Sequence, residues 1–486
     1  MKADILGFFN SPAILLELQT YLAAVSPTHH HRIMAHLKKS APLHLSELGM
    51  RDMVVALCRY FSGDQGVIPL SGLQPLLDCP KLDELSSHYD TIGLQSLSKL
   101  ACIKLNGGLG TTMGCDGPKS LIHIDPHHRF IDMILANVNQ WRSRGNVPIP
   151  LVLLNSYHTM ADTMAAVSDP HTHFLLQHQV PRLDARSGMP LIASHSDLEW
   201  NPPGHGDLFH SLYASGLLKT LVDQGITVAF VANSDNLAAT IDLRLLGYLI
   251  AEDVSFMLEA TPKLPSDQKG GSLAMRNGRP CLLERSQVSP DDWELLDQIS
   301  QYPLFNTNSI WIHLPSLLTI LEKAPMTLPL IVNPKVVEGV PVVQLETAMG
   351  AAVEQLARSQ VVVVPRSRFF PVKTTRDLIV LRSNCVQKNG DGSIEWSTLP
   401  SISLSSHYQE VNALSHLIPH GLQFDANATL TLNGPVVFQK PCYIRGDVTL
   451  THALSEPVAC GEVELANVTK QADDSGWHVL VPDSSS

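Results

Sequence analysis

Apolar and polar positions follow three different patterns along the 486 residues of the chain. From about residue 98 to residue 384, continuous apolar runs alternate with helical stretches. Two of these runs, Ile149–Leu154 and Ile226–Ala232, end directly at polar residues. Such runs are typical of strands buried on both faces of a parallel sheet. Because a helical pattern at Leu208–Val222 lies between them, the region predicts an α/β domain with ligands at the carboxyl ends of its strands.

Two other patterns flank this region. Residues 1–97 carry short apolar runs with turn signals at Ser26-Pro27 and Ser62-Gly63, which predicts a helical region without chemistry of its own. In residues 385–486 the helical pattern fades, and short β runs at Ala428–Phe438 and Tyr443–Leu450 are separated by Gly, Pro and Asn. Their even spacing predicts coils of a β-helix with Asn-Gly and Arg-Gly at the corners, and a small β-sandwich is the alternative.

Composition narrows the class of protein. A length of 486 residues predicts two or three domains, and 44% hydrophobic with 16% charged residues predicts a folded globular chain. The net charge of −12 argues against a broad nucleic-acid surface, so no nucleic acid is expected as a partner.

Two further features bear on location. The first residues lack the basic stretch and long apolar run of a secretory signal, and no run of about 18 apolar residues occurs, so no membrane partner is expected. The eight cysteines are scattered without a Cys-x-x-Cys pair. Scattered cysteines indicate reduced thiols in a cytoplasmic protein rather than disulfides or a zinc site.

The most informative stretch is a glycine-rich loop. Five glycines lie within about eleven residues, after an apolar run and before Lys119. Glycines allow positive φ and let backbone N–H groups approach a phosphate closely, and a lysine adds a fixed charge. The spacing excludes a dinucleotide fingerprint, because Met113 stands where a third glycine is needed, and a Walker A loop, because Pro118 separates Gly117 from Lys119.

The loop also identifies a family. Leu105–Lys119 resembles the nucleotide loop of eukaryotic-type UDP-glucose pyrophosphorylases, and not the Ala-Gly-Gly-Gln-Gly loop usual in the related UDP-N-acetylhexosamine enzymes. Seven blocks in the family's order cover roughly residues 100 to 385. The six that follow the loop are Pro202–Asp207, Asn233–Asn236, Phe305–Asn308, Asn333–Lys335, Gln344–Gly350 and Val364–Thr375.

The resemblance implies a fold and an activity. The fold is a helical N-terminal region (1–97), a Rossmann-like nucleotidyltransferase domain with a mixed sheet and helices on both faces (98–384), and a C-terminal left-handed β-helix (385–486). The activity is that of a UTP–glucose-1-phosphate uridylyltransferase, which converts UTP and glucose 1-phosphate reversibly to UDP-glucose and pyrophosphate. The sugar phosphate attacks the α-phosphate directly and in line with Mg²⁺ present, so the protein positions anions and neutralises charge. A homo-oligomer joined through the C-terminal domain is compatible with this layout.

Three residues would carry the chemistry by this resemblance. Lys119 would contact the triphosphate, and Lys373 would bridge the phosphates of both substrates and stabilise charge in the transition state. Asp235 follows a predicted strand, where one carboxylate with substrate oxygens and water is a usual arrangement for Mg²⁺.

Other residues would bind the substrates. His205 would hydrogen-bond the glucose phosphate, while Gln177 and Gly204 would read the uracil edge, although Gln179 lies only two residues from Gln177. The remaining assignments are Leu105, Asn106, Gly107 and Gly108 in the nucleotide loop, and Asn233, Gly271, Glu284, Asn306 and Asn308 for the sugar hydroxyls.

Two other functions compete with this interpretation. One is a UDP-sugar pyrophosphorylase of broad specificity, which would accept galactose 1-phosphate or other hexose phosphates. The other is a non-catalytic scaffold that binds nucleotide sugars. Such a scaffold has no reason to keep Lys119, Asp235 and Lys373 together, so the sequence favours an enzyme.

Overall fold

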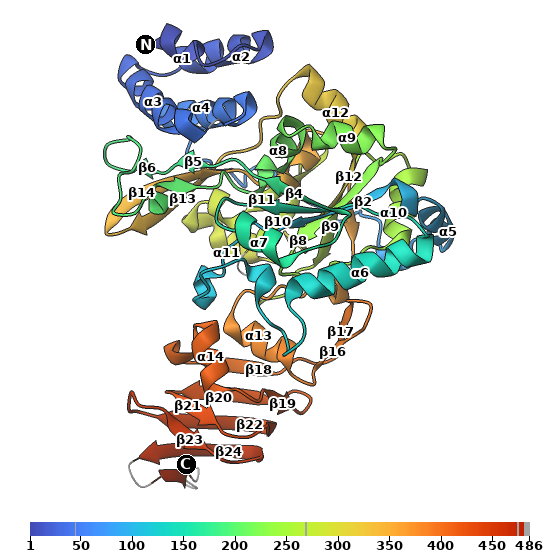
Figure 1. Ribbon diagram of the computed structural model, residues 1–486, viewed down its shortest axis with the longest axis vertical. Coiled ribbons are helices and arrows are strands. Elements are labelled where there is room, and N and C mark those ends of the chain that lie inside the picture. The colour runs from blue at the N-terminus through green and yellow to red at the C-terminus, as the bar shows by residue number, and fades with distance from the viewer. Residues whose placement is uncertain (44, 268–269, 474–475, 481–486) are drawn as a thin grey trace. The chain divides into compact units, whose positions relative to one another are not determined.

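The computed structural model describes residues 1–43, 45–267, 270–473 and 476–480, and Figure 1 shows the order of its elements. The chain packs as two compact units that interleave along the sequence. The first unit combines residues 1–107, 141–233 and 241–366, and the second combines residues 108–140, 234–240 and 367–486. Because these units follow packing rather than chain order, the boundaries at residues 97 and 384 stay a prediction.

A mixed sheet forms the centre of the first unit. Strands β8, β2, β3 and β4 run parallel in that order, β12 pairs antiparallel with β8, β9 and β10, and β15 runs parallel to β9. The predicted α/β class is therefore confirmed. The strands of the sheet are β1 (Gln74–Pro75), β2 (Leu100–Leu105), β3 (Leu151–Asn155), β4 (Thr172–Leu176), β8 (Val228–Asn233), β9 (Phe256–Pro262), β10 (Gly271–Arg276), β11 (Arg279–Glu284), β12 (Leu304–His313) and β15 (Ser359–Val363).

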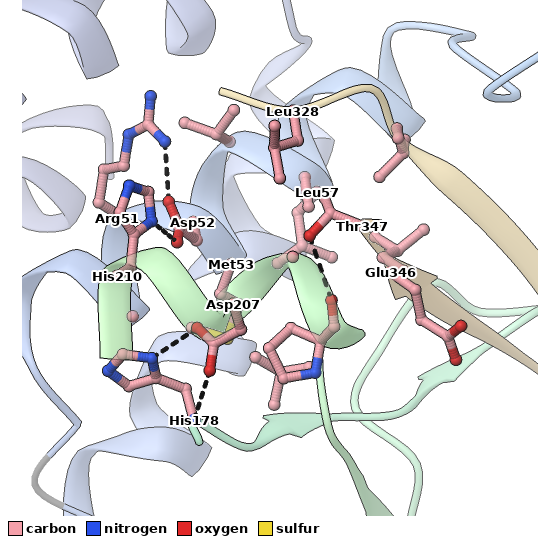
Figure 2. Close-up of a pocket in the computed structure, with 18 of the residues that line it drawn as sticks. Arg51, Asp52, Met53, Leu57, His178, Asp207, His210, Leu328, Glu346 and Thr347 are labelled. Carbon is pink, nitrogen blue, oxygen red and sulfur yellow. Dashed lines mark hydrogen bonds and ion pairs between the residues drawn. The ribbon is translucent and has the colours of Figure 1, made fainter. Parts of the chain in front are cut away.

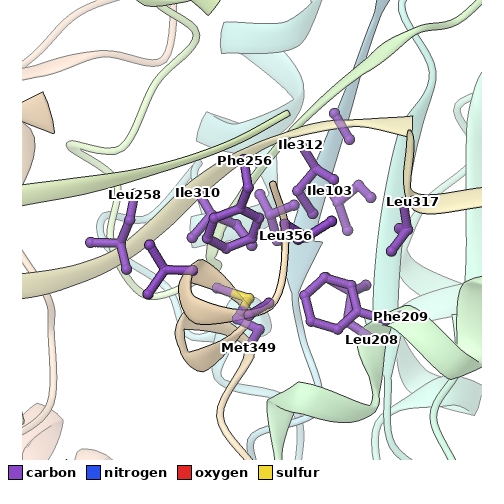
Figure 3. Close-up of a cluster of buried hydrophobic side chains, with 14 of the residues drawn as sticks. Ile103, Leu208, Phe209, Phe256, Leu258, Ile310, Ile312, Leu317, Met349 and Leu356 are labelled. Atoms are coloured by element: carbon purple, nitrogen blue, oxygen red, sulfur yellow. The ribbon is translucent and has the colours of Figure 1, made fainter. Parts of the chain in front are cut away.

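The central strands are apolar because both of their faces are buried. In β8 every residue from Val228 to Ala232 is fully buried. On one face, Ile103, Ile310 and Ile312 pack against helices α8, α9 and α12 (Figure 3). The helices of the sheet region are α6 (Phe130–Gly145), which begins in the second unit, α7 (Met160–Ala166), α8 (Leu208–Ala214), α9 (Leu217–Asp223), α10 (Leu243–Ala251), α11 (Trp293–Asp297) and α12 (Leu314–Lys323).

The predicted helical stretch at Leu208–Val222 is helical but divided. Helix α8 ends at Ala214 and α9 begins at Leu217. Gly216 between them has φ +75, a left-handed conformation that glycine adopts readily and that ends a right-handed helix. Apolar periodicity continues through the break, which is why the sequence pattern does not reveal it.

Five α-helices occupy the described part of residues 1–97, in agreement with the sequence pattern there. They are α1 (Lys2–Leu6), α2 (Pro12–Ala23), α3 (Pro27–Ser40), α4 (Glu47–Phe61) and α5 (His88–Gln95). The first four share a buried cluster that includes Leu18, Ile33 and Leu57, and this cluster continues onto Val343 and Leu345. Those two residues belong to β14 (Val340–Glu346), which pairs with β13 (Ile331–Val337) and β6 (Leu183–Asp184). The short strands β5 (Val180–Pro181) and β7 (Trp200–Asn201) pair nearby in the sequence.

Parallel strands dominate the C-terminal part of the second unit. Strands β18, β20, β22 and β24 form a parallel ladder, β19 pairs parallel with β22, and β21 pairs parallel with β23. Among the named strands of this C-terminal part, antiparallel pairing, which a β-sandwich requires, occurs in the described residues only at β16–β17 and β24–β25. The elements are α13 (Thr375–Arg382), β16 (Val386–Lys388), β17 (Ile394–Trp396), β18 (Ser401–Leu404), α14 (Val411–Leu417), β19 (Leu422–Phe424), β20 (Thr429–Asn433), β21 (Val436–Phe438), β22 (Cys442–His452), β23 (Val458–Cys460), β24 (Glu464–Asp473) and β25 (Gly476–Val479).

Glycines at the two predicted corners have left-handed backbone conformations. Residues Cys442–Ile444 of β22 pair with β19, whereas Asp447–Thr451 pair with β20, so the strand changes partner at Arg445-Gly446. Gly446 has φ +56, and Gly434 of the Asn-Gly corner has φ +103. Helix α14 interrupts the region, although the sequence pattern there is not helical.

Candidate active site

The glycine-rich loop folds back on itself. The backbone N–H of Lys119 donates to the carbonyl oxygen of Gly108 at 3.3 Å, and Leu109 forms a bridge with Pro118. A Cβ on Gly110 would lie 2.7 Å from the Cβ of Cys115, so only glycine allows this close approach. The closed loop places Lys119 beside the residue at which the loop begins.

Lys119 and Lys373 share one carboxylate oxygen. The Nζ atom of each lysine donates to Oδ2 of Asp235, and both distances are 2.9 Å. Lys119 Nζ also donates to the carbonyl oxygen of Val372 at 2.9 Å. The side chain of Lys373 is 54% exposed, whereas that of Asp235 is 11% exposed. The three residues predicted to carry the chemistry therefore meet within the second unit.

Backbone contacts fix this cluster. The N–H of Val372 donates to the carbonyl oxygen of Asp235 at 3.0 Å, and the N–H of Phe370 donates to the side chain of Asn236 at 2.9 Å. The N–H of Lys373 donates to Asp377, which also forms a capping box with Thr374 at the start of α13. A capping box holds the first turn of a helix, so Lys373 has a defined backbone position.

The charges in the cluster determine the state of Asp235. Burial alone would raise the pKa of this carboxyl, but the ammonium groups of Lys373 and Lys119 outweigh burial and lower the pKa. Asp235 is therefore ionised at neutral pH. Its other oxygen, Oδ1, is buried and has no hydrogen-bond partner among the residues that the structure describes.

Five predicted sugar-binding residues come together in the first unit. Asn308 Nδ2 donates to Asn233 Oδ1 at 2.9 Å, and the N–H of Asn308 donates to Asn306 Oδ1 at 3.0 Å. Gly271 is paired in register with Glu284, and a Cβ on Gly271 would lie 3.2 Å from Glu284 Oε1 and 3.4 Å from the Cβ of Asn306. The cluster joins the ends of β8, β10, β11 and the middle of β12, and its amides and carboxyl suit sugar hydroxyls.

Glu284 has an unusual environment within this cluster. Burial raises the pKa of its carboxyl to about 7. Close to neutral pH the group therefore exists in both protonation states, and it donates a hydrogen bond in one state and only accepts in the other.

The loop that carries Gly204 and His205 is held by the segment after β14. The N–H of Gly206 donates to the carbonyl oxygen of Thr347, and the N–H of Thr347 donates to that of Pro203, both at 2.9 Å. Gly204 has φ +85, and a Cβ there would lie 2.4 Å from the Thr347 carbonyl oxygen. The N–H of Met349 donates to His205 Nδ1 at 3.0 Å, so the neutral ring carries its proton on Nε2.

Gln177 lies against the start of the nucleotide loop. A Cβ on Gly107 would lie 2.4 Å from Gln177 Oε1, and Ser156 Oγ donates to the Gly107 carbonyl oxygen at 2.8 Å. The side chain of Asn106 points into the fold, where its Nδ2 donates to Asn155 and Thr163. Leu105 ends β2 between β3 and β8. The structure thus brings Gln177 to Gly107, and Asn106 supports the loop from within.

These features define a class. A parallel strand that leads into a glycine-rich loop, together with two lysines gathered on one buried carboxylate, is the arrangement of an α/β enzyme that handles nucleotide phosphates. A comparison with protein-family models narrows this class. The model described as "UTP–glucose-1-phosphate uridylyltransferase" matches residues 74–445 of the chain. The chain belongs to this family.

Curated relatives and solved structures agree. The UTP–glucose-1-phosphate uridylyltransferase of Hordeum vulgare is 36% identical over 431 residues, which cover 84% of this chain and 89% of the relative. That of Encephalitozoon cuniculi is 39% identical over 365 residues, 73% of each chain. A UDP-glucose phosphorylase from Trypanosoma brucei aligns with a TM-score of 0.82 at 32% identity, covering 91% of this chain and 100% of the other. A mutant UDP-glucose pyrophosphorylase from Leishmania major in complex with UDP-glucose aligns with a TM-score of 0.81 at 31% identity, covering 90% and 99%.

The sequence did not reveal the residues that support the site. Thr347 and Met349 hold the His205 loop, and Val372 accepts from Lys119, but none of them carries a recognisable functional side chain. Their signal was present in the family blocks Gln344–Gly350 and Val364–Thr375. The sequence alone does not predict that these blocks contact segments more than a hundred residues away in the chain.

The raised pKa of Glu284 makes a prediction about stability. Because the folded state favours the protonated carboxyl, the stability of the fold should fall as pH rises from about 4.5 to about 7 and stay lower above that value. Glu284→Gln removes this dependence. Between about pH 5 and about pH 8, the variant's melting temperature should rise relative to the wild type by on the order of a few °C. Glu294→Gln, at an exposed glutamate, is the control. A difference that does not change with pH would contradict the burial of the charge.

Proposed function

We propose that this chain catalyses the reversible conversion of UTP and glucose 1-phosphate to UDP-glucose and pyrophosphate. The observation that carries the proposal is the pair of lysines on Asp235, within a chain of this family. A reaction between two anions needs positive charge where they meet, and two ammonium groups on one carboxylate supply a net charge of that sign.

The reaction needs no nucleophile from the protein. An oxygen of glucose 1-phosphate attacks the α-phosphorus of UTP, the new P–O bond forms, and the bond to pyrophosphate breaks on the opposite side. Lys119, at the end of the glycine-rich loop, binds the triphosphate. Lys373, which is more than half exposed, lies between the phosphates of the two substrates and stabilises the charge that concentrates as they approach.

The remaining residues orient the two substrates. His205 donates from Nε2 to the glucose phosphate, because its Nδ1 accepts from Met349. Asn308 Oδ1 is buried without a partner among the described residues and suits a sugar hydroxyl. Gln177 and the backbone of Gly204 read the uracil edge, and the position of Gln177 against Gly107 favours it over Gln179 for this role.

Magnesium fits the donors at Asp235. In the described part of the chain, no group of three or more His, Cys, Asp and Glu side chains is placed to hold a metal ion. Mg²⁺ in nucleotide enzymes uses one or two carboxylates together with substrate phosphates and water. Asp235 offers one ionised carboxylate whose Oδ1 has no partner among the described residues, so Asp235 would hold the ion. A bound Mg²⁺ would supply further neutralisation of phosphate charge.

Three broader properties belong to the same proposal. The C-terminal ladder is a left-handed β-helix, supported by parallel partners that lie 18 residues apart at Leu430 and Val448, the length of three hexapeptides. This region would also join the copies of a homo-oligomer. The location is cytoplasmic, supported by eight cysteines that are all free. Among described residues, no helix combines the length and apolar character of a bilayer span.

Pyrophosphate release tests the function directly. The chain mixed with UTP, Mg²⁺ and glucose 1-phosphate should release pyrophosphate, whereas omission of the sugar phosphate should abolish release. The same assay with galactose 1-phosphate and other hexose 1-phosphates tests specificity, and kcat/KM for glucose 1-phosphate should be about tenfold or more above the others. Equal values would favour the broad-specificity alternative, and no release with any sugar would leave only a binding protein.

Replacement of Lys373 tests the transition-state role. Lys373→Ala should lower kcat by about 10²–10³ in synthesis and in pyrophosphorolysis, because both directions share one transition state, while KM changes little. Lys373→Arg should recover only part of the loss, because a planar guanidinium does not replace a compact ammonium. Arg376→Ala removes an exposed cation three residues away and should leave kcat unchanged. Wild-type kcat in Lys373→Ala would exclude the bridging role and make Lys119 the leading candidate.

Replacement of Asp235 tests the magnesium assignment. Asp235→Asn keeps the size but removes the charge, so kcat should fall by about two orders of magnitude or more. A second readout avoids turnover: Mg²⁺ added to the UTP-bound wild type should raise its melting temperature, and the variant should lose that increment. Near-normal activity at saturating Mg²⁺, or an unchanged increment, would remove Asp235 from the metal site.

A further inference from the structure

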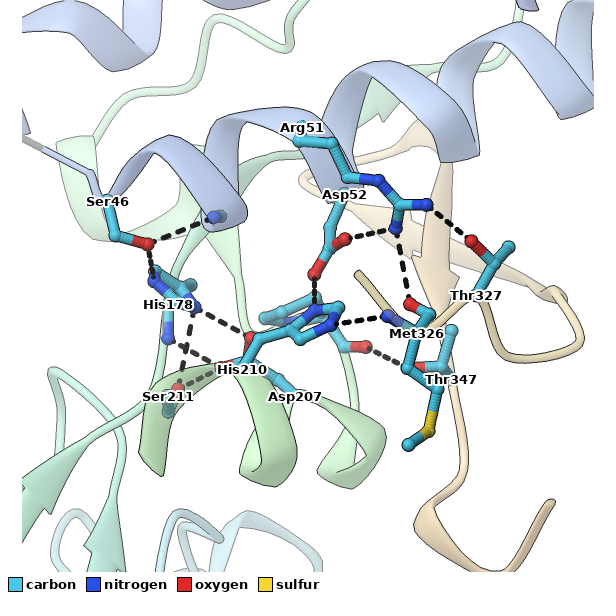
Figure 4. Close-up of polar contacts among 12 residues, drawn as sticks. Ser46, Arg51, Asp52, His178, Asp207, His210, Ser211, Met326, Thr327 and Thr347 are labelled. Atoms are coloured by element: carbon cyan, nitrogen blue, oxygen red, sulfur yellow. Dashed lines mark hydrogen bonds and ion pairs between the residues drawn. The ribbon is translucent and has the colours of Figure 1, made fainter. Parts of the chain in front are cut away.

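One buried carboxylate connects two segments that carry substrate-binding residues. Asp207 is 4% exposed, and both of its oxygens accept hydrogen bonds (Figure 4). Oδ1 accepts from the ring Nδ1 of His178 at 2.7 Å. Oδ2 accepts from the backbone N–H of His178 at 2.8 Å and from Ser211 Oγ at 2.7 Å. The carboxylate therefore fixes both the backbone and the side chain of His178.

The neighbours of these two residues are the substrate-binding residues. Gln177 directly precedes His178, and Gly204, His205 and Gly206 directly precede Asp207. The bonds from His178 to Asp207 thus join the residue that reads uracil to the loop that binds the sugar phosphate. A change in these bonds would move both at once.

The ring of His178 is held from its other side by the N-terminal helices. Its Nε2 lies 2.6 Å from Ser46 Oγ, and that oxygen also accepts the N–H of Gly49 as the N-cap of α4. A Cβ on Gly49 would lie 2.4 Å from Cδ2 of the ring, so glycine makes room for it. The order Ser46, His178, Asp207 is that of a hydrolase triad. Here, however, the serine oxygen caps a helix, and the chain of bonds acts as a strut between α4 and the two substrate segments.

The space beside this strut is too small for a substrate. The cavity there has a volume of about 70 Å³, and Arg51, Asp52, His210 and Thr347 line it together with His178 and Asp207 (Figure 2). Ligand sites for small molecules usually measure about 300–1,000 Å³. The network therefore acts on the substrates only through the segments that it holds.

We propose that Asp207 and His178 are positioning residues, which fix the uracil-reading segment and the sugar-phosphate loop relative to each other, with Ser46 as support from α4. This inference rests on the proposed function, because it takes the roles of Gln177 and His205 from it.

A second histidine–aspartate pair provides a matched control. His210, on α8, pairs through Nδ1 with Asp52 of α4 and accepts the N–H of Met326 at Nε2 (Figure 4). His210 is 5% exposed, and its bond to Asp52 joins α8 to α4. Its two hydrogen bonds, to Asp52 and from Met326, reach neither Gln177 nor the 203–206 loop. Loss of this pair should therefore lower stability without moving the substrates.

Two substitutions of His178 separate the two ends of the strut. In His178→Asn the amide nitrogen takes the place of Nδ1 and keeps the bond to Asp207. In His178→Gln it takes the place of Nε2, so the side chain keeps its bond to Ser46 and loses its bond to Asp207 Oδ1, while the backbone N–H still donates to Asp207 Oδ2. His178→Gln should raise KM for both UTP and glucose 1-phosphate by about tenfold, whereas His178→Asn and the control His210→Asn should stay within about twofold. Asp207→Asn should behave like His178→Gln, and the double variant should be no worse than either single variant.

Hydrogen exchange gives a readout that needs no substrate. The amides of Gly206 and Thr347 are bonded across the loop, so they should exchange faster in His178→Gln than in the wild type, but not in His178→Asn or His210→Asn. A silent wild-type enzyme would refute the proposed function alone, because exchange still reports on the loop. Wild-type KM and exchange in both His178→Gln and Asp207→Asn, or equal effects of His210→Asn, would overturn the positioning role. If His178→Gln does not unfold cooperatively, the KM values and amide exchange rates of Asp207→Asn test the positioning role instead.

Discussion

The site depends on a buried carboxylate that holds two ammonium groups. Removing a carboxylate from water is costly, and only close cations with good geometry offset that cost. Asp235 meets this condition with Lys119 and Lys373, each 2.9 Å from the same oxygen. These residues come from three segments separated by more than a hundred residues, so the electrostatic requirement of one side chain brings the segments together. The same arrangement leaves an ionised oxygen available and presents Lys373 to solvent, which are the properties that phosphate chemistry needs.

The first unit also contains a buried carboxylate that needs close partners, and its partners hold a loop and the segment at His178 in place. Asp207 satisfies both of its oxygens with His178 and Ser211, and Thr347 bonds the backbone on either side of His205. Glycines at 204 and 206 are required because a Cβ at either position would lie 2.4 Å from Thr347. The His205 loop is therefore held mainly by backbone hydrogen bonds to Thr347, and a buried carboxylate, Asp207, holds the segment at His178.

The sequence predicts features that have a local pattern and does not predict contacts between distant segments. Strands β3 and β8 were predicted because continuous apolar runs need burial on both faces. The phosphate loop was predicted because five glycines before a lysine let the backbone approach a phosphate closely. The roles of Lys119, Asp235 and Lys373 came from the resemblance, since each is locally an ordinary residue. The break at Gly216 was missed because apolar periodicity does not register a positive φ. The bond between His178 and Asp207 spans 29 residues and leaves no periodic trace in the sequence.

The central claim is that the two lysines and Asp235 serve a single in-line displacement, without a covalent intermediate on the protein. The stereochemical course at the α-phosphorus tests it most directly. UTP with sulfur replacing one non-bridging α-oxygen, as a single diastereomer, would be converted to the corresponding thio analogue of UDP-glucose and its configuration determined. One in-line displacement predicts inversion. Retention would require two displacements, and hence a nucleophile on the protein, which would contradict the account.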